Sequence, residues 1–378
     1  MDRRSELQTL AAAIRDSAKL WLIGPRRYGK SSLLNSAAAR ARAAGLIVLR
    51  YDAEAFPTVE QLAARISADA AARLTGTVEK GRKAVLRLFA SLRPEASIEP
   101  DGTLSVRLAG AANRASGVPL LSDVLDALEA AAVKSRRPVV VMIDEFQKIV
   151  ADDLAAKQQL RAAVQKHRKV GYVFAGSATR LLTDMTADPR EPFYRLGSTL
   201  FLGPVPRQEF AAFLTQSFTR GGIRIESGAV TAILDAAQDV PYNVQLLAHE
   251  CWEACRSSLV PGSASQPLML TEQVVDRVHA RAARQNDPLY TQTWSSLPST
   301  QQRALLAIVR DAGPGLFSTA LARRYAMPVA TMQKAVAALE RRGITREEAS
   351  GGRTRLRLED PLFGKWIELT IPRSAAEY

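Results

Sequence analysis

The residues best suited to chemistry form one stretch, GPRRYGKSS, at positions 24–32. From Gly24 to Ser31 it matches the pattern G-x-x-x-x-G-K-[ST], in which backbone N–H groups surround the phosphates of a nucleotide. The apolar run KLWLIG precedes it and a helical pattern follows, which is the context that a phosphate loop requires. The pattern predicts that Lys30 reaches the β and γ phosphates and that the Ser31 hydroxyl ligates Mg²⁺.

The middle of this loop is bulky and basic for a structure that surrounds a small anion. Only the backbone has to face the phosphates, so we expect the side chains of Arg27 and Tyr28 to point outward. The nucleotide-binding residues predicted in this stretch are Gly24, Pro25, Arg26, Arg27, Tyr28, Gly29, Lys30, Ser31 and Ser32.

Two acidic residues, Asp144 and Glu145, follow the apolar run VVVMI. A carboxylate at the carboxyl end of a central strand can hold Mg²⁺ directly or through water, and we predict this role for Asp144 together with Ser31. Glu145 is the predicted catalytic base that orients and deprotonates the attacking water. We expect the strand that carries both acids to lie beside the strand that precedes the phosphate loop.

A third polar position, Ser177, ends the run FAGS on the next predicted strand. A side chain there could sense the γ-phosphate from between the two motifs, and we include it among the catalytic candidates. The alternative is a small residue that a tight turn requires.

The elements that must position these residues alternate between helix and strand, as in a parallel α/β sheet. The predicted strands cover residues 19–24, 46–53, the acidic-ended run and 170–182, and the predicted helices cover 5–18, 31–45, 58–74, 122–137 and 154–169. Residues 75–120 interrupt this alternation with a basic amphipathic segment and two alternating runs that meet at a turn, 100–102. We expect a short helix and a β-hairpin inserted on the surface.

The second half of the chain has a different pattern. From Pro204 the strands stop, and helical spacing predicts an all-α segment. Three helices and a β-hairpin then follow, a pattern typical of a winged helix-turn-helix. We therefore predict an α/β core at 1–205 with an insertion at 75–120, a helical domain at 206–288 and a winged-helix domain at 289–378.

Composition limits the class of protein. The 378 residues are 47% hydrophobic and carry a net charge of +13, enough apolar residues to bury real cores. No apolar run is long enough for a membrane span and the N-terminus has no signal-peptide core, so we expect a cytoplasmic protein without a membrane partner. Basic residues are in excess at both ends, which favours an anionic partner, although abundant Arg and Ala are also typical of GC-rich genomes.

Cys251 and Cys255 lie one helical turn apart, and we expect core-facing thiols there rather than a zinc site or a disulfide.

Several stretches taken together resemble a known family. The order of elements is similar to that of AAA+ ATPases, and more narrowly to the archaeal-type ATPase group of the STAND NTPases. The matching stretches are DRRSEL, GPRRYGKSSLL, IDEFQ, FAGSATRLL with PFYR, VPYNVQLL and RLEDPLFGKW. The resemblance covers almost the whole chain. It implies ATP as the nucleotide, ADP as the product, an N-terminal α/β core, a helical lid and a C-terminal winged helix.

The resemblance also implies roles for individual residues. The group favours G-x-R-x-x-G-K-[ST], so Arg26 occupies a typical position, and Arg26→Ala is expected to weaken nucleotide binding or communication between domains. The Gly-x-Pro that precedes the lid helix in this group is here Asp239-Val240-Pro241, which makes Pro241 a candidate contact near the base. The usual Tyr-Gly-Arg is here Phe193-Tyr194-Arg195. Arg195 is the candidate arginine finger on a neighbour's nucleotide, with Arg180 and Arg190 as competitors and a surface arginine as the alternative for each.

In the predicted winged helix, the segment PVATMQKAVAALERRG would be the recognition helix. Its outward residues are Thr331, Gln333, Lys334 and Arg341, and the wing carries Arg346, Arg353, Arg355 and Arg357. This domain could bind DNA, or it could dock a partner protein. The basic run at 165–169 could contact DNA or an adjacent subunit. The alternative is a helix C-terminus that positive charge stabilises. We expect a Mg²⁺-dependent ATPase switch that is DNA-associated through the winged helix. The alternatives are a nucleotide-regulated signalling or defence switch that binds partner proteins or copies of itself, and a degenerate loop that binds nucleotide without turnover.

Overall fold

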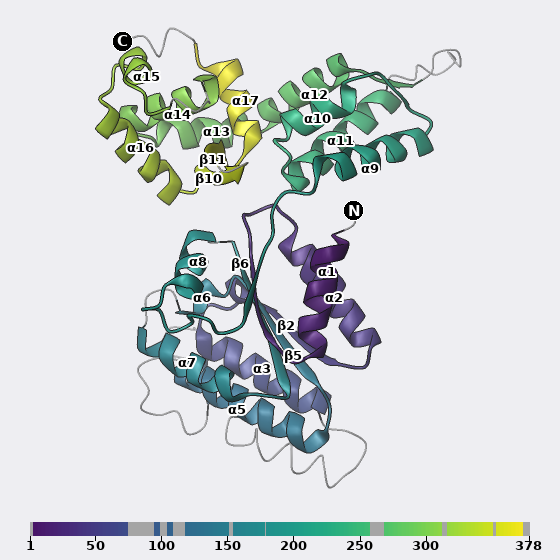
Figure 1. The fold of residues 1–378 in the computed structure, drawn as a ribbon, viewed down its shortest axis with the longest axis vertical. Helices are drawn as coiled ribbons and strands as arrows, with labels where there is room; N and C mark the ends of the chain where they lie inside the picture. Colours follow the sequence, from purple (N-terminus) through teal and green to yellow (C-terminus); the bar gives the residue numbers. More distant parts are fainter. Residues whose placement is uncertain are drawn as a thin grey trace. The chain divides into compact units, whose positions relative to one another are not determined.

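The computed structural model describes residues 3–74, 94–98, 104–108, 118–150, 154–177, 179–257, 268–311, 316–350 and 353–372. The chain divides into two compact units, one ending at Gly203 and the other beginning at Pro204. Figure 1 shows a central sheet between helices in the first unit and packed helices in the second.

The first unit is built on a five-stranded sheet in the order β2-β5-β6-β1-β7, in which every neighbouring pair is parallel. Its strands are β1 (Lys19–Ile23), β2 (Ile47–Asp52), β5 (Val139–Asp144), β6 (Val170–Gly176) and β7 (Ser198–Phe201). Parallel strands joined by helices confirm the predicted α/β class. The expected neighbourhood of β1 and β5 is wrong, because β6 pairs with both and separates them.

Helices cover both faces of this sheet (Figure 1). The covering helices are α1 (Arg4–Arg15), α2 (Lys30–Ala43), α3 (Val59–Leu74), α5 (Val118–Ser135) and α7 (Leu154–Lys166). One face of the sheet and the apolar stripes of α3, α5 and α7 form a single buried core. β5 and β6 are buried along their whole length, as strands covered on both faces must be.

Two short helices begin where central strands end. The four-residue α6 (Gln147–Val150) follows β5, and α8 (Thr179–Ala187) follows β6. The predicted strand at 170–182 is therefore wrong beyond Gly176, because the apolar residues of its second half belong to a helix. The edge strand β7 was missed in the sequence, since three of its four residues are exposed and give no apolar run.

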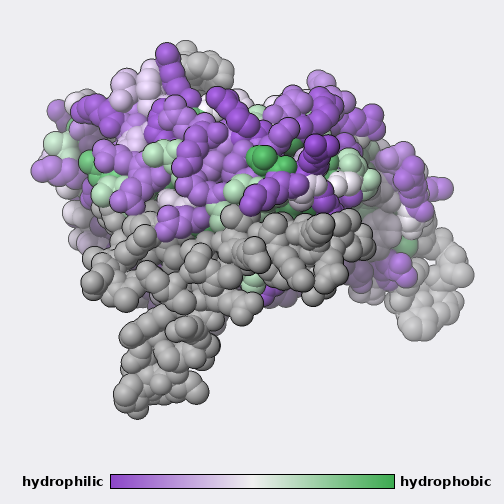
Figure 2. Space-filling model, turned by 90° about the horizontal axis from the view of Figure 1, so that it is seen from below, coloured by the Kyte–Doolittle hydropathy of each residue, from purple (hydrophilic) through white to green (hydrophobic). Residues whose placement is uncertain are grey.

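Within the predicted insertion, β3 (Pro94–Ile98) and β4 (Leu104–Leu108) form an antiparallel pair. The helix expected before them lies outside the described residues. Figure 2, a view from below relative to Figure 1, shows a described surface that is mostly hydrophilic with small hydrophobic areas.

The second unit begins with α9 (Arg207–Arg220), α10 (Ala229–Ala236), α11 (Pro241–Ser257) and α12 (Glu272–Gln285). The all-α prediction for this segment is wrong in one detail, since the two-residue strands β8 (Arg224–Ile225) and β9 (Met269–Leu270) form a parallel pair. Cys251 and Cys255 are free, buried thiols on α11, as expected. Burial raises the pKa of Cys251 to about 12.

The chain ends with α13 (Asp287–Ser295), α14 (Ser299–Asp311), α15 (Thr319–Arg324), α16 (Val329–Arg341), β10 (Thr345–Ser350), β11 (Arg353–Leu358) and α17 (Pro361–Thr370). β10 and β11 pair antiparallel directly after α16. The helices of the whole second unit share one hydrophobic core. Within the described ranges, no helix has both the length and the hydrophobicity that crossing a membrane requires.

Candidate nucleotide site

The phosphate loop connects β1 to the N-terminus of α2. Arg27 and Gly29 both adopt left-handed backbone conformations, with φ values of +67° and +87°. Gly29 caps the helix, and its carbonyl accepts the hydrogen bond of the Leu33 amide at 2.9 Å. The backbone N–H groups of the first turn of a helix point along its axis, and at the start of α2 they favour an anion at this position.

The lysine of the phosphate-loop pattern, Lys30, folds back across its own loop. The buried Lys30 Nζ donates to the Pro25 carbonyl oxygen at 2.9 Å, across the width of the loop. Ser31 and Ser32 lie beside it and are exposed. A bound phosphate would offer Lys30 a charged acceptor in place of a neutral carbonyl, and such charge-assisted hydrogen bonds are about twice as strong.

The outward orientation predicted for Tyr28 is wrong, whereas that of Arg27 holds. The Tyr28 side chain is only 1% exposed, and Arg27 is exposed. The left-handed turns on either side of Tyr28 direct its ring into the protein, where an aromatic side chain removes a large apolar area from water. Arg26 is 71% exposed and its guanidinium lies 4.0 Å from the Glu54 carboxylate, so its proposed effect on nucleotide binding stays a prediction.

The two predicted metal ligands are in direct contact. The Ser31 hydroxyl donates to Asp144 Oδ2 at 2.7 Å, although the residues are 113 positions apart in the chain. Arg50, on the neighbouring strand β2, places its guanidinium 3.8 Å from the same carboxylate oxygen. Hydroxyl and carboxylate oxygens are ligands that Mg²⁺ prefers, so this pair fits the predicted cation.

Glu145 lies directly after β5 in a left-handed conformation, with φ of +49°. Its Oε2 accepts hydrogen bonds from the Ser177 hydroxyl at 2.9 Å, the Ser177 amide at 3.3 Å and Gln147 Nε2 at 2.5 Å. The Glu145 carboxylate is therefore fixed at the carboxyl edge of the sheet, between the end of β5 and the end of β6.

The structure brings most predicted site residues to this one edge. β6 lies between β1 and β5, so Ser177 lies between the phosphate loop and the acidic pair. Beneath them the rings of Trp21, Phe146, Phe174 and Phe193 pack with centroids 4.5–5.7 Å apart. This aromatic cluster supports both the strand ends and the loop that leads to Arg195.

The candidate fingers differ in their contacts. Arg190 is paired with Asp188 at 2.7 Å. Arg195 is exposed, adopts a left-handed conformation with φ of +55° and lies over the Tyr194 ring at 5.0 Å. No carboxylate pairs with Arg195 among the described residues, and the side chain of Arg180 is not described. Arg195 is thus the candidate that a neighbouring molecule could engage without breaking an ion pair.

Asp239 stands where the expected Gly-x-Pro has a glycine, and its surroundings accommodate the change. Asp239 adopts the left-handed conformation, with φ of +57°, that a glycine would adopt readily, and Asp is one of the residues that tolerate it. Its carboxylate oxygens each lie 2.9 Å from Arg207. Pro241 is buried as the first residue of α11 in the second unit, so its contact with a base stays a prediction.

Three residues of this region contact the predicted site although their sequence context predicts no role for them. Arg50 interrupts the apolar run LIVLRYD, and a charge at such a position was the available signal. Gln147 was only part of the stretch IDEFQ, but its side chain holds Glu145. Arg3 was only part of DRRSEL, and it donates to the phosphate-loop carbonyl of Tyr28.

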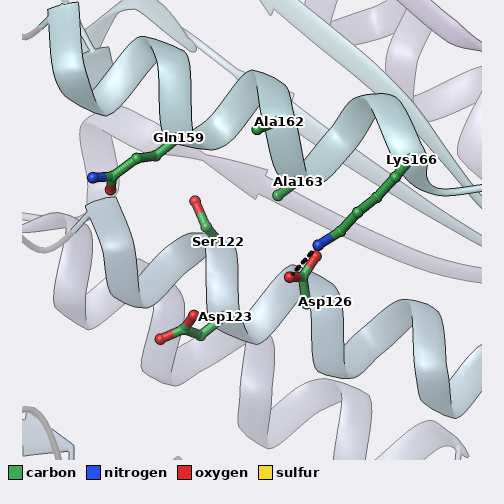
Figure 3. A pocket seen from close by; sticks show the side chains of 7 residues that line it. All are labelled: Ser122, Asp123, Asp126, Gln159, Ala162, Ala163 and Lys166. Carbon is green, nitrogen blue, oxygen red and sulfur yellow. Dashed lines mark hydrogen bonds and ion pairs between the residues drawn. The ribbon is translucent and has the colours of Figure 1, made fainter.

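The first unit also has a shallow groove between α5 and α7 (Figure 3), lined by Ser122, Asp123, Asp126, Gln159, Ala162, Ala163 and Lys166. Lys166 crosses it to Asp126 at 2.7 Å. None of the predicted site residues lines this groove. His167 of the basic run is buried between Asp126 and Tyr172, and burial lowers its pKa, so this side chain is not a surface contact for DNA.

Comparisons with known proteins agree with this fold. The family model described as Novel STAND NTPase 1 matches residues 1–339. The Walker-type ATPase PABY2304 of Pyrococcus abyssi is 15% identical, with 97% of this chain and 95% of that chain covered and a TM-score of 0.61. The ORC2 protein of Aeropyrum pernix, in ADPNP–ADP complexes, is 17% identical, with 97% and 93% covered and a TM-score of 0.52. At these identities the likeness shows a shared fold. Among curated proteins, no sequence matches this chain.

Proposed function

This chain belongs to the Novel STAND NTPase 1 family, and on that premise we propose that it binds ATP with Mg²⁺ and hydrolyses it to ADP. The observation that carries the proposal is the 2.7 Å contact between Ser31 and Asp144, with Glu145 fixed beside it. A phosphate loop, a metal-ligand pair and a candidate base meet at one sheet edge. Catalysis of phosphoryl transfer consists mostly of such positioning and charge stabilisation.

Each residue has a defined task in this proposal. The N–H groups at the start of α2 and the Lys30 ammonium bind the phosphates, and Ser31 and Asp144 hold Mg²⁺. When bound by these two residues, Mg²⁺ would supply positive charge that offsets the negative charge of the phosphates. Glu145 accepts a proton from the attacking water, and Ser177 with Gln147 orients its carboxylate.

Direct binding and turnover measurements test this proposal. The parent chain is expected to bind a fluorescent ATP analogue and to release phosphate only with Mg²⁺. Lys30→Ala removes a charged donor, which weakens the binding of a charged partner by roughly 10- to 100-fold. Lys19→Ala is the control, because this lysine of β1 donates to the His167 carbonyl instead. Equal nucleotide affinity in the parent and in Lys30→Ala would contradict the proposed site.

We further propose that ATP turnover changes the arrangement of three parts, the core at 1–205, a lid at 206–288 and a winged helix at 289–378. The order α14, α15, α16, β10, β11 supports the winged-helix assignment. On α16 the predicted outward residues Gln333, Lys334 and Arg341 are exposed, and Met332, Val336 and Leu339 are buried. This exposed face is the proposed DNA contact.

A second candidate function is a switch that binds partner proteins and not DNA. The observation that favours it is the burial of Arg346, a residue that the sequence pattern assigns to a phosphate-binding wing. This side chain is only 8% exposed and donates to the Leu358 carbonyl at 2.7 Å. The predicted wing therefore offers fewer cations to DNA than its sequence indicates.

Turnover with and without duplex DNA, over a salt series, separates the two candidates. Contacts to phosphates release counterions, so a DNA-associated switch is stimulated by DNA and loses this stimulation as salt rises. Lys334→Ala is expected to reduce the stimulation without changing turnover in the absence of DNA. An ATP turnover rate that is the same with and without DNA at every salt concentration would favour the protein-binding switch.

A further inference from the structure

One side chain joins the phosphate loop to the end of the first unit. Arg3, the residue before α1, donates through Nη2 to the Tyr28 carbonyl oxygen at 3.1 Å and to the Gly203 carbonyl oxygen at 2.8 Å. Its Nη1 donates to Glu6 Oε1 at 3.0 Å, and the Arg3 side chain is only 12% exposed. Three segments that are far apart in the sequence therefore meet at a single guanidinium group.

The two carbonyl groups belong to segments of different function. Tyr28 lies in the phosphate loop, between the left-handed residues Arg27 and Gly29. Gly203 is the last residue of the first unit, after which the second unit begins. A shift of the loop on nucleotide binding would move one acceptor of a shared nitrogen relative to the other.

A second set of contacts connects the same two segments. The Leu202 amide donates to the Ile23 carbonyl at 2.7 Å, immediately before the loop. A Cβ added at Gly24 would lie 2.7 Å from the Leu202 carbonyl oxygen, closer than side-chain atoms approach backbone. The first glycine of the phosphate loop is therefore needed here for close packing against the chain that leaves the unit.

From this geometry, and resting on the proposed nucleotide binding, we propose that Arg3 is a positioning residue that couples the phosphate loop to the junction at Gly203. Arg3 fixes the loop for the nucleotide and transmits its state to the segment from which the second unit starts. Glu6 keeps the guanidinium oriented, because it accepts from Nη1 while Nη2 donates to the two carbonyl oxygens. Nucleotide occupancy then alters the backbone at residues 199–206.

Hydrogen exchange of the full chain, with and without ADP and Mg²⁺, tests this coupling without turnover. In the parent, ADP is expected to slow exchange both in residues 25–34 and in 199–206. In Arg3→Ala, ADP affinity is expected to fall about tenfold, since the charge-assisted hydrogen bond that holds the loop at the Tyr28 carbonyl is lost. At saturating ADP, this variant is expected to protect 25–34 but no longer 199–206.

Two further variants make the result specific. Arg15→Ala removes an arginine that is 75% exposed at the other end of α1, and it is expected to match the parent. Arg3→Lys keeps the charge on a shorter arm with one nitrogen, so we expect ADP affinity within about threefold of the parent and reduced protection of 199–206. If Arg3→Ala does not fold, this lysine variant decides the question.

The outcomes are distinct. Parent-like protection of 199–206 in ADP-saturated Arg3→Ala or, where that variant does not fold, in Arg3→Lys would overturn the coupling and leave nucleotide binding intact. A purely structural role would lower the melting temperature of Arg3→Ala without removing the ADP response at 199–206, and this result would also overturn the coupling. Failure of the parent to bind ADP would overturn the proposed function, and the coupling with it.

Discussion

At the scale of single residues, one oxygen atom carries much of the proposed chemistry. Oε2 of Glu145 accepts two hydrogen bonds from Ser177 and one from Gln147. Its other oxygen, Oε1, has no hydrogen-bond partner within the described part of the chain and is therefore available to a water molecule. The donors on Oε2 decide where that second oxygen points.

Removing one of these donors has a testable effect. Ser177→Ala is expected to lower the rate of ATP turnover about tenfold while nucleotide affinity stays unchanged, because the carboxylate loses the hydroxyl that orients it. Steady-state kinetics and analogue binding measure the two quantities. Ser36→Ala is the control, since this hydroxyl donates only to its own helix, at the Ser32 carbonyl. A weaker affinity at full rate would instead assign Ser177 to phosphate binding.

Arg50 is the second residue-scale case. Its guanidinium lies 3.8 Å from Asp144 Oδ2, where it competes with a cation for the same carboxylate. Because like charges repel, Arg50→Gln is expected to lower the Mg²⁺ concentration for half-maximal ADP binding by several-fold. A magnesium titration of analogue fluorescence measures this. A higher Mg²⁺ requirement would show that Arg50 orients Asp144 rather than competing with the metal.

At the scale of elements, local sequence patterns predict where individual strands and helices lie, because neighbouring residues determine these positions. Apolar runs with acidic or glycine ends located β1, β5 and β6, and helical spacing located α2, α3 and α7. The order of strands could not be predicted in this way, because adjacency depends on how crossovers pass the sheet. For this reason β6 was not expected between β1 and β5.

In the candidate site, likewise, residues inside local motifs could be predicted, and residues that act through long-range contacts could not. The phosphate-loop pattern and the acidic pair singled out Ser31 and Asp144, and the structure brings these two side chains into contact at 2.7 Å. Their roles as Mg²⁺ ligands stay predictions. Tyr28 was misjudged because its burial follows from left-handed backbone on both sides, which the letters do not reveal. The contacts of Arg3 and Arg50 are long-range, so nothing in their local sequence identified a partner.

Where α12 packs against α17, a buried histidine predicts how low pH affects the stability of the second unit. Burial, with a contribution from Lys365, lowers the pKa of His279 on α12 to about 4. Asp276 acts in the opposite direction, but it is bound to Lys365 at 3.1 Å. The folded His279 therefore stays neutral between pH 6.5 and 4, whereas the unfolded chain takes up a proton.

Stability must then fall as the pH falls through this range. The second unit is expected to lose on the order of 1–3 kcal/mol of unfolding free energy between pH 7 and pH 4.5 from this residue. Denaturant unfolding, followed by exchange of the α12 amides, measures the loss, and His279→Gln is expected to reduce it. An equal loss in both proteins would show that other groups cause the acid sensitivity.

At the scale of the whole molecule, the open question is whether one chain completes another's site. Arg195 is exposed and free of carboxylate partners among the described side chains, whereas Arg190 is paired with Asp188. If Arg195 acts on a neighbour's nucleotide, Arg195→Ala abolishes turnover and keeps ATP binding. Arg190→Ala is the matched control and is expected to retain activity.

Mixing two inactive variants tests this arrangement. Arg195→Ala has an intact phosphate loop, and Lys30→Ala has an intact Arg195. An equal mixture is expected to recover about a quarter of the parent turnover, because one in four random head-to-tail pairs joins the intact halves. No recovery, from variants that still assemble, would mean that Arg195 does not act between chains.

If this sheet edge hydrolyses ATP with Glu145 as the base, removing the basicity of that side chain must stop turnover without weakening ATP binding. For Glu145→Gln, ATP affinity is expected within about twofold of the parent and single-turnover hydrolysis is expected to slow by roughly 10²- to 10⁴-fold. Gln keeps the size of the side chain and removes its basicity. Hydrolysis at the parent rate by Glu145→Gln would show that Glu145 is not the catalytic base.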